Sequence, residues 1–295
     1  MKKTIIIGGG PAGMTCAIQL QRYGLEPLLL EKRELGGLLW NANLVENYPG
    51  FPNGVRGEKL IGLMKKQIER LGVEIKREEV AKVEWDGTQF SVVTQCATHA
   101  TDFLVVASGT NPRPLPEVVS PEARKRVFTE VWPLADVTDK QIVIIGAGDA
   151  AFDYAINLVK KRNFVTILNR GETVKCLPLL FERATREAQI TYRVGVIVSA
   201  VKVDETGTRL NVENDAGTLD ADYVLYAIGR VPNVEFLSDE IRQRKNELVK
   251  AGQLYFIGDV KNELFRQVAI AAGDGLRAAM EIYSQIENLR TKEQR

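Results

Sequence analysis

The chain has 295 residues, of which 45% are hydrophobic and 26% are charged, and its formal net charge is +1. That length suits two domains, and the composition is ordinary for a folded protein in water. A nearly neutral chain offers no field that attracts nucleic acid or an anionic membrane, and no apolar run reaches the roughly 18 residues of a membrane span. Lys2-Lys3 before an apolar run imitates a signal peptide, but glycines follow where the apolar run would have to continue. We therefore expect a cytoplasmic protein without nucleic acid or membrane partners.

The first 31 residues carry the pattern of a dinucleotide-binding unit. A β-branched run at 4–7 predicts a buried strand, and the turn GGGPAG follows at 8–13. A helical pattern then occupies 14–24, and a second apolar strand at 27–30 leads into Glu31. Strand, GxGxxG turn, helix, strand and acid in this order indicate a dinucleotide site rather than a merely structural glycine turn.

Each polar or glycine position of this unit has a physical role. Gly8 permits the tight turn, Gly10 lets backbone N–H groups approach a pyrophosphate, and Gly13 lets helix and strand pack closely. The helix N-terminus directs its unpaired N–H groups at the phosphates. Glu31 follows at the spacing of a carboxylate that binds a ribose hydroxyl pair.

The middle of the chain alternates irregular and regular segments. Glycine and proline between 35 and 52 predict a long connection, which in compact domains tends to be functional. Residues 57–72 predict an amphipathic helix that stops at a glycine, and 80–94 predict a hairpin that turns at Asp86-Gly87. A buried strand is expected at 103–107, and the sequence NPRP at 111–114 indicates a hinge.

A second nucleotide-binding pattern begins at Gln141. A strand is expected at 142–145, a GxGxxA turn at 146–151, a helix at 152–160 and the next strand at 164–168. The alternative is a crossover that serves only the fold.

The rest of the chain predicts more strands and one long helix. Residues 197–212 and 223–227 are strand-like, and GRVPN at 229–233 is a second hinge candidate. A last strand at 254–257 ends in Gly-Asp, and a helix from 267 to about 288 follows. Two nucleotide-binding units, the second bracketed by hinges, indicate one domain inserted in another and a layout for electron transfer between two cofactors.

Several stretches resemble the low-molecular-weight thioredoxin reductase family of flavoproteins. The stretches are GGGPAG (8–13), VENYPGFP (45–52), ASGT (107–110), YAIGRVPN (226–233), FIGD (256–259) and RQVAIAAGDG (266–275). The second together with the last is the most specific, and the similarity runs from Lys3 to about Ile282. The resemblance implies an α/β fold of two Rossmann-like, three-layer ββα domains, with the NAD(P)-type domain inserted in the FAD domain. It places the FAD domain at 1–112 and 234–295 and the inserted domain at 113–233, and it implies a homodimer.

The resemblance also implies the site residues, position by position. The FAD positions are Gly8, Gly10, Pro11, Ala12, Gly13, Glu31, Lys32, Gly37, Leu38, Asn47, Ala107, Gly109, Gly258, Asp259, Gln267 and Val268. The NADPH or NADH positions are Gly146, Gly148, Asp149, Ala150, Arg170 and Lys175. Val268 would bring the positive end of the last helix to the flavin's pyrimidine edge, where negative charge develops on reduction. For Asn47 and Gln267 a loop-fixing hydrogen bond is an equal alternative.

The chain departs from this family at the redox-active CxxC. Thr129-Glu130-Val131-Trp132 occupies that place, and Pro133 replaces the acid that follows it in the family. Neither threonine nor tryptophan supplies a thiolate, so we expect no thioredoxin reduction by that route. Trp132 is the single candidate for a residue at the flavin face, with packing of the domain linker as the equal alternative.

A second departure concerns the coenzyme. NADPH-specific members have HRRxxxR after the second strand of the inserted domain, where this chain has NRGETVK at 169–175. Arg170 and Lys175 remain as cations and Gly171 replaces an arginine. Two cations can hold a phosphate, but solvated surface charge is an equal reading, so the sequence leaves three outcomes open: NADPH, NADH or loss of both.

The cysteines and the histidine of this chain form no metal-binding or dithiol pattern. Cys16, Cys96 and Cys176 lie far apart and His99 is the single histidine, so we expect no metal site.

Three functions remain open. The first is an FAD oxidoreductase that takes hydride from NAD(P)H and passes electrons on without a dithiol, as in thioredoxin-reductase-like ferredoxin–NAD(P) reductases, with ferredoxin or flavodoxin as partner. The second is an NAD(P)H oxidase or a reductase of quinones or other small molecules. The third is a non-catalytic flavin-bound subunit or sensor.

Overall fold

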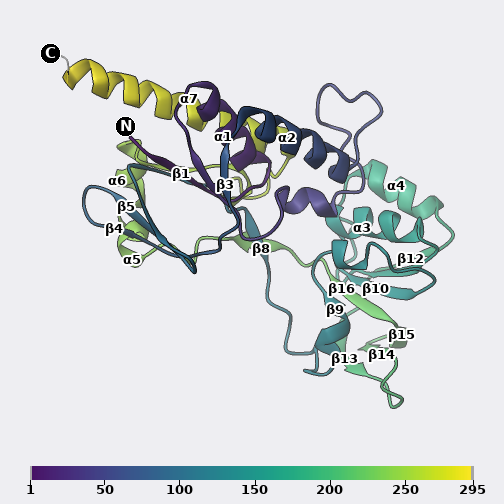
Figure 1. The fold of residues 1–295 in the computed structure, drawn as a ribbon. Helices are drawn as coiled ribbons and strands as arrows, with labels where there is room; N and C mark the ends of the chain where they lie inside the picture. The colour runs from purple at the N-terminus through teal and green to yellow at the C-terminus, as the bar shows by residue number, and fades with distance from the viewer. Residues whose placement is uncertain (1, 294–295) are drawn as a thin grey trace. The chain divides into compact units, whose positions relative to one another are not determined.

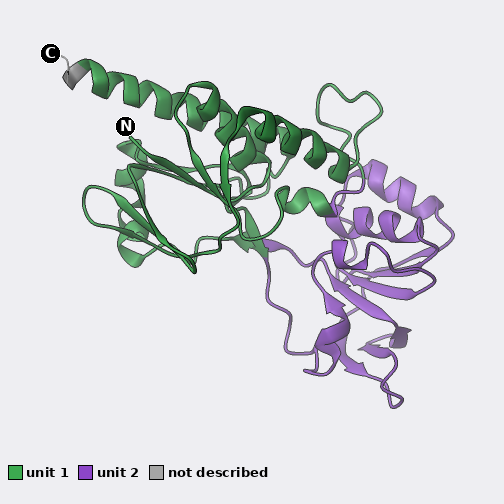
Figure 2. Ribbon diagram, in the orientation of Figure 1, with its two compact units in different colours: residues 1–40, 44–111, 231–295 green, residues 41–43, 112–230 purple. Residues whose placement is uncertain are grey.

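The computed structural model describes residues 2–293, which form two compact units (Figure 2). Unit 1 contains residues 1–40, 44–111 and 231–295, and unit 2 contains residues 41–43 and 112–230. Unit 2 is thus an insertion between two parts of unit 1, apart from the three residues 41–43. The domain boundaries drawn from the sequence stay a prediction.

Unit 1 is built on a five-stranded parallel sheet in the order β18-β7-β1-β2-β3 (Figure 1). A second, antiparallel sheet has the order β4-β5-β6. The strands are β1 (Thr4–Ile7), β2 (Leu28–Leu30), β3 (Glu74–Lys76), β4 (Val80–Trp85), β5 (Phe90–Thr94), β6 (Thr98–Thr101), β7 (Phe103–Val106) and β18 (Leu254–Phe256). The helices are α1 (Pro11–Arg22), α2 (Gly57–Leu71), α5 (Asp239–Gln243), α6 (Lys245–Lys250) and α7 (Val268–Glu293), with 3-10 turns η1 (Gly37–Asn41) and η4 (Gly258–Val260).

Alternate residues of β1 explain the three layers of unit 1. Ile6 packs into one apolar core with α1 and α7, where Met14 and Ala279 are fully buried. Ile5 and Ile7 point to the other face and pack into a second core with the antiparallel sheet. Burial on both faces is why this strand is a continuous apolar run.

Unit 2 repeats this plan. Its parallel sheet has the order β12-β11-β10-β16-β9, and a three-stranded antiparallel sheet has the order β13-β14-β15. The strands are β9 (Val127–Phe128), β10 (Gln141–Ile145), β11 (Phe164–Leu168), β12 (Ile190–Arg193), β13 (Val198–Val203), β14 (Leu210–Asn214), β15 (Gly217–Ala221) and β16 (Tyr223–Tyr226). The helices are α3 (Asp149–Val159) and α4 (Pro178–Arg186), with 3-10 turns η2 (Ala123–Arg126) and η3 (Trp132–Leu134).

The two hinge candidates of the sequence lie side by side. They form the short strands β8 (Thr110–Pro112) and β17 (Arg230–Pro232), which pair with each other. The N–H of Asn233 donates to Gly109 O at 3.0 Å, and the hydroxyl of Ser108 donates to Asn233 O at 2.6 Å. Both chain connections therefore run through one paired element, and hinge motion stays a prediction.

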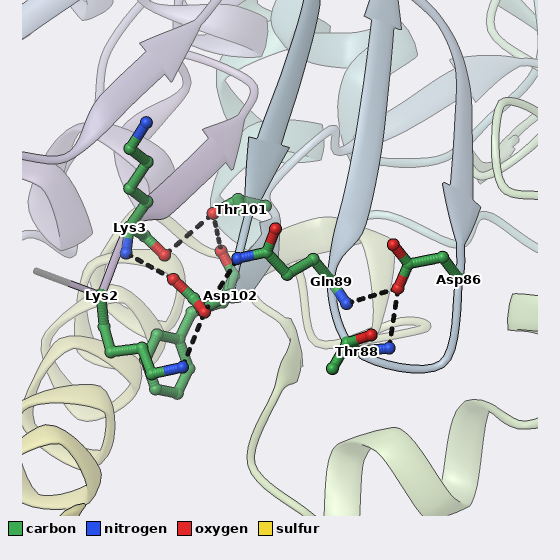
Figure 3. A network of polar contacts seen from close by, with 8 residues as sticks. Lys2, Lys3, Asp86, Thr88, Gln89, Thr101 and Asp102 are labelled. Carbon is green, nitrogen blue, oxygen red and sulfur yellow. Dashed lines mark hydrogen bonds and ion pairs between the residues drawn. The ribbon is translucent and has the colours of Figure 1, made fainter.

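The start of the chain is tied to the sheets of unit 1 by one carboxylate (Figure 3). Asp102 accepts hydrogen bonds from Lys2 Nζ at 2.9 Å, from the backbone N–H of Lys3 at 2.8 Å and from Gln89 Nε2 at 3.3 Å. Although burial raises the pKa of Asp102, these hydrogen bonds outweigh it and leave the pKa below its usual value. The contact fixes the first strand, which carries the first glycine turn.

The elements expected from the sequence are present, with shifted ends. Helix α1 begins at Pro11 rather than at 14, because a proline in the first helical turn has no N–H to lose. The expected strand-like stretch 197–212 is two antiparallel strands, β13 and β14, because the turn around Gly207 (φ +73°) divides it. Helices α4, α5 and α6 and strands β3, β6, β9, β12 and β15 were not expected from the sequence.

Candidate dinucleotide sites

The glycine turn of unit 1 leaves no room for side chains. Gly8 has a φ of +108°, and a Cβ there would lie 2.4 Å from Ala107 O. A Cβ at Gly13 would lie 1.9 Å from Gly8 O. These close backbone approaches explain why the sequence needs glycine at both positions, and they place Ala107 beside the turn.

The N-terminus of α1 is open toward an anion. Gly10 precedes the helix in an extended conformation, and no side chain caps the helix there. Pro11 has no N–H, so the N–H groups of Ala12 and Gly13 are the donors of this helix end. Gly37 in η1 lies against the same turn, since a Cβ on it would be 3.2 Å from Gly10 Cα. Leu38 follows in η1 and is half-buried.

Glu31 lies beside the turn, at the end of β2. Its Oε2 accepts a hydrogen bond from the N–H of Gly9 at 2.6 Å, and its Oε1 accepts one from the N–H of Arg33 at 2.9 Å. The carboxylate is therefore fixed beside the glycine turn, and its ribose-binding role stays a prediction. The ammonium of Lys32 lies 3.7 Å from a carboxylate oxygen of Glu79, with which it forms an ion pair.

Asn47 and Gln267 contact each other. Asn47 Nδ2 donates to Gln267 Oε1 at 2.9 Å, which joins the long connection to the residue before α7. Gln267 O also accepts the N–H of Ala271, and Val268 begins the helix. This is a hydrogen bond of the loop-fixing kind that the sequence left as an alternative.

Asp274, which sequence reasoning missed, fixes the turn that carries Gly258 and Asp259. Its Oδ2 accepts hydrogen bonds from the N–H of Gly258 at 3.0 Å and from Asn262 Nδ2 at 2.7 Å. Lys261 Nζ lies 2.9 Å from its other oxygen. The available signal was the AGDG sequence itself, in which the acid stands between two glycines.

Unit 1 fits an anionic dinucleotide such as FAD. The Nε of Arg266 is buried and, among the described residues, has no hydrogen-bond partner. A buried guanidinium nitrogen without a partner is costly, and a phosphate or ribose oxygen would satisfy it. Arg266 directly precedes Gln267, and Gly109, the third residue of the ASGT stretch, has a φ of +63°.

Unit 2 has the same turn at the same place in its sheet. Gly146 has a φ of +133°, and a Cβ there would lie 2.3 Å from Ala227 O. Gly148 precedes α3 without a side-chain cap, and the exposed Ala150 lies in the first turn. Asp149 Oδ1 accepts the N–H of Leu177 at 2.8 Å, so this acid fastens the loop after β11.

That loop passes over the turn. The N–H of Lys175 donates to Ala147 O at 3.1 Å, and Lys175 forms an isolated bridge with Gly148. Arg170 is exposed at the start of the loop. The structure thus brings Lys175 to the glycine turn and Arg170 to the end of β11.

The turn at 129–132, where the resembled family has CxxC, is held by polar contacts. Arg230 Nη2 donates to Glu130 Oε1 at 3.0 Å in a half-buried ion pair. Asn41 Oδ1 accepts the N–H of Val131 at 3.1 Å and of Trp132 at 3.2 Å. Trp132 is 48% exposed, although tryptophan is highly buried on average in folded proteins.

Within residues 2–293 no helix combines the length and apolar character that crossing a membrane requires. The same range holds no group of three or more His, Cys, Asp or Glu side chains placed to bind a metal ion.

Comparison with known proteins agrees with this layout. The family model described as pyridine nucleotide-disulphide oxidoreductase matches residues 2–275. The thioredoxin reductase of Mycolicibacterium smegmatis is 30% identical over 293 residues, which cover 94% of each chain. The crystal structure of Lactococcus lactis thioredoxin reductase is 28% identical and covers 96% of this chain and 98% of its own, with a TM-score of 0.83.

A relative with a different named activity is also similar over nearly its whole length. Glucosaminate ammonia-lyase of Pseudomonas fluorescens is 27% identical over 309 residues, 97% of this chain and 96% of its own. The predicted fold class, two Rossmann-like domains of the FAD and NAD(P) type, is confirmed by the structural matches. Thioredoxin reductase-type enzymes use FAD and NADPH. The chain belongs to the pyridine nucleotide-disulphide oxidoreductase family and is a thioredoxin reductase-like flavoprotein oxidoreductase.

Proposed function

We propose that the protein takes hydride from NAD(P)H into a bound FAD and passes the electrons to an acceptor without a protein dithiol. The observation that carries this proposal is the turn at 129–132. Its residues Thr129 and Trp132 have no sulfur, and its backbone N–H groups are engaged by Asn41. Bound FAD supplies a two-electron acceptor that can release electrons singly or in pairs.

The cysteines elsewhere do not replace the missing dithiol. All three are free thiols, and Cys16 is fully buried, so burial raises its pKa far above the ordinary thiol range. Burial and the nearby Asp149 also raise the pKa of Cys176. Since the thiolate is the reacting form, both are poor nucleophiles, and Cys96 is exposed on a different unit from Cys176.

The residues of unit 1 are assigned to FAD under this proposal. The donors of the α1 N-terminus would bind the pyrophosphate and Glu31 the ribose hydroxyls. Asp259 would bind the ribitol region, and Asn47, Gln267 and the α7 N-terminus would lie at the flavin. The geometry that supports this assignment is the tight Gly8–Gly13 turn together with the unsatisfied Arg266 Nε.

For the acceptor we propose a small acidic electron carrier of the ferredoxin or flavodoxin type. Arg124, Lys125 and Arg126 in η2 are consecutive cations, and among residues 2–293 none of them has an ion-pair partner. They lie at one end of β9, and the turn with Trp132 follows its other end. A cluster of unpaired cations increases the association rate of an acidic partner.

The deciding experiment is an anaerobic stopped-flow reduction of the FAD-loaded protein with NADH and with NADPH, followed at the flavin band. Steady turnover should then be compared with ferredoxin, flavodoxin, a quinone and oxygen. Reduction of a carrier protein faster than of oxygen supports the proposal, and preference for quinone or oxygen supports the small-molecule reductase or oxidase. If neither coenzyme reduces the flavin, the protein is not this oxidoreductase.

A charge-reversal pair tests the proposed carrier surface. Lys125→Glu should slow ferredoxin reduction at low salt by about tenfold in kcat/KM, because it turns attraction into repulsion. Lys161→Glu, an exposed position at the end of α3, is the matched control. Equal effects of both variants would reject η2 as the docking surface. Sedimentation of the FAD-loaded protein tests the homodimer that we propose from the family.

A further inference from the structure

The two glycine turns have equivalent hydrogen bonds but different residues beside them. The N–H of Gly8 donates to Leu30 O at 2.8 Å, and the N–H of Gly146 donates to Leu168 O at 3.0 Å. The residue after each leucine therefore occupies the same place in its unit. That residue is Glu31 in unit 1 and Asn169 in unit 2.

Asn169 does not act as Glu31 does. Its Oδ1 accepts the N–H of Gly171 at 3.0 Å, and its Nδ2 donates to Thr173 O at 3.0 Å and to Tyr192 Oη at 2.9 Å. Asn169 is 8% exposed, and its side chain is held by its own loop and by Tyr192 of β12. Unit 2 thus lacks, at this position, the carboxylate that would bind a ribose 2′-hydroxyl and repel a 2′-phosphate.

The backbone of Arg193, on the neighbouring strand, lies beside the loop that has glycine at 171. Arg193 ends β12, its Cα is paired with that of Leu168, and its carbonyl accepts the N–H of Asn169 at 2.9 Å. Beyond it, the N–H of Gly195 donates to Gly171 O at 3.2 Å. Residues 193–195 therefore run alongside residues 169–171. Gly171, in the second stretch, stands where the resembled family has its middle arginine.

Three cations at this end of the sheet have no neutralising partner among the described residues. Arg170, Lys175 and Arg193 are exposed, and within the described part of the chain none has an ion-pair or side-chain hydrogen-bond partner. Glu172 is the one acid between 169 and 175, and it is also exposed. Asp149, near the turn, is occupied by the N–H of Leu177. The three cations outnumber the single carboxylate of Glu172, so the net charge beside the glycine turn of unit 2 is positive.

We infer that Arg193 is a specificity-determining residue that binds the 2′-phosphate of NADPH together with Arg170 and Lys175, in place of the arginine lost at Gly171. The inference rests on the proposed function, because it takes unit 2 to bind the nicotinamide coenzyme. A guanidinium suits a phosphate because its N–H groups form a fork that matches two oxygens. Because Asn169 is uncharged and its side chain is held by the protein, no carboxylate at this position repels the phosphate.

The test is calorimetric binding of two coenzyme fragments to the FAD-loaded protein, which requires no turnover. The fragment 2′,5′-ADP carries the 2′-phosphate, and 5′-AMP lacks it. Wild type should bind 2′,5′-ADP at least about tenfold more tightly, since a charge-assisted hydrogen bond corresponds to that factor or more. Arg193→Ala should weaken 2′,5′-ADP by about tenfold and leave 5′-AMP unchanged, and Arg193→Lys should recover part of the loss.

Lys161→Ala is the matched control, because it removes an exposed cation near the opposite end of β11. Equal binding of the two fragments by wild type, or equal effects of Arg193→Ala on both fragments, would overturn the inference. Such results would leave the proposed function intact if NADH still reduces the flavin. Conversely, fragment discrimination by a protein whose flavin neither coenzyme reduces would retain the phosphate site and reject the proposed function.

Discussion

Asn41 caps the backbone of Trp132. Its side-chain oxygen accepts the N–H of Trp132 at 3.2 Å and that of the preceding Val131 at 3.1 Å. Asn41 is itself 5% exposed; its hydrogen bond with Val131 is buried, and the one with Trp132 is partly buried. Trp132 therefore carries a half-exposed ring on a backbone that is held by a buried side chain.

Removing the Asn41 side chain should destabilise the turn at 129–132. Asn41→Ala leaves two backbone N–H groups without an acceptor, and a buried unsatisfied donor costs about 1–3 kcal/mol. We expect a lower unfolding temperature in a scan followed by tryptophan emission. Asn53→Ala, at an exposed loop position, is the control and should match wild type. An unchanged transition in Asn41→Ala would mean that water replaces the amide without loss.

The FAD turn should not tolerate a methyl group at Gly13. A Cβ there would lie 1.9 Å from Gly8 O, and backbone on both sides cannot move apart without opening the turn. Gly13→Ala should therefore retain little FAD after gel filtration, whereas wild type should retain one FAD and no FMN per chain. Gly62→Ala in α2 is the control, because nothing lies within 4 Å of a Cβ there and its φ is outside the left-handed region. Full FAD retention by Gly13→Ala would contradict the assignment of residues 8–13.

Disulfide reduction should be absent. In an assay that couples NADPH oxidation to thioredoxin and insulin, the protein should show no catalysis, because positions 129 and 132 carry no sulfur. The variant with Cys16, Cys96 and Cys176 all changed to serine should behave identically. Activity that survives in this variant would reveal an electron route to disulfides that does not use protein thiols.

The pH dependence of stability should report on Asp153. Its carboxylate accepts the N–H of Asn43 at 3.0 Å, and burial raises its pKa above the ordinary aspartate value. The folded state then binds this proton more tightly than the unfolded state, so the charged form costs stability at neutral pH and the cost disappears on acidification. The stability of wild type relative to Asp153→Asn should rise as the pH falls from 7 toward about 4, the range above an unfolded aspartate's pKa. A difference that is constant over this range would show that the pKa of Asp153 is not raised.

Sequence reasoning reached the fold because its signals were local. The glycine turns at Gly8 and Gly146 each indicate a strand before the turn and a helix after it. Glu31 follows the first turn at the spacing typical of a ribose-binding acid. The contacts that position the sites are not local: Asn41 reaches Val131, and Asn47 reaches Gln267. No periodicity links residues 90 or 220 positions apart, so these partners could not be predicted from one sequence. Short helices such as α5 (Asp239–Gln243) were missed because five residues are too few for a helical period to appear.

The last prediction concerns the ring that Asn41 helps to fix. We expect Trp132 to cover the flavin in one relative arrangement of the two domains, where the family's dithiol would otherwise approach. Stacking on a flat π-system is favourable by about 1 kcal/mol beyond burial, and the ring would exclude water and oxygen from reduced flavin. Trp132→Ala should therefore shift the flavin absorption spectrum and accelerate the reaction of reduced flavin with oxygen in a stopped-flow experiment. FAD affinity should stay nearly constant, because the proposed ADP contacts lie in the 8–13 turn. Trp132→Phe should keep most of the shielding, and Phe164→Ala, which removes a comparably exposed aromatic ring of unit 2, should match wild type. If Trp132→Ala leaves both spectrum and oxygen rate unchanged while stability falls, Trp132 packs the linker and does not shield the flavin.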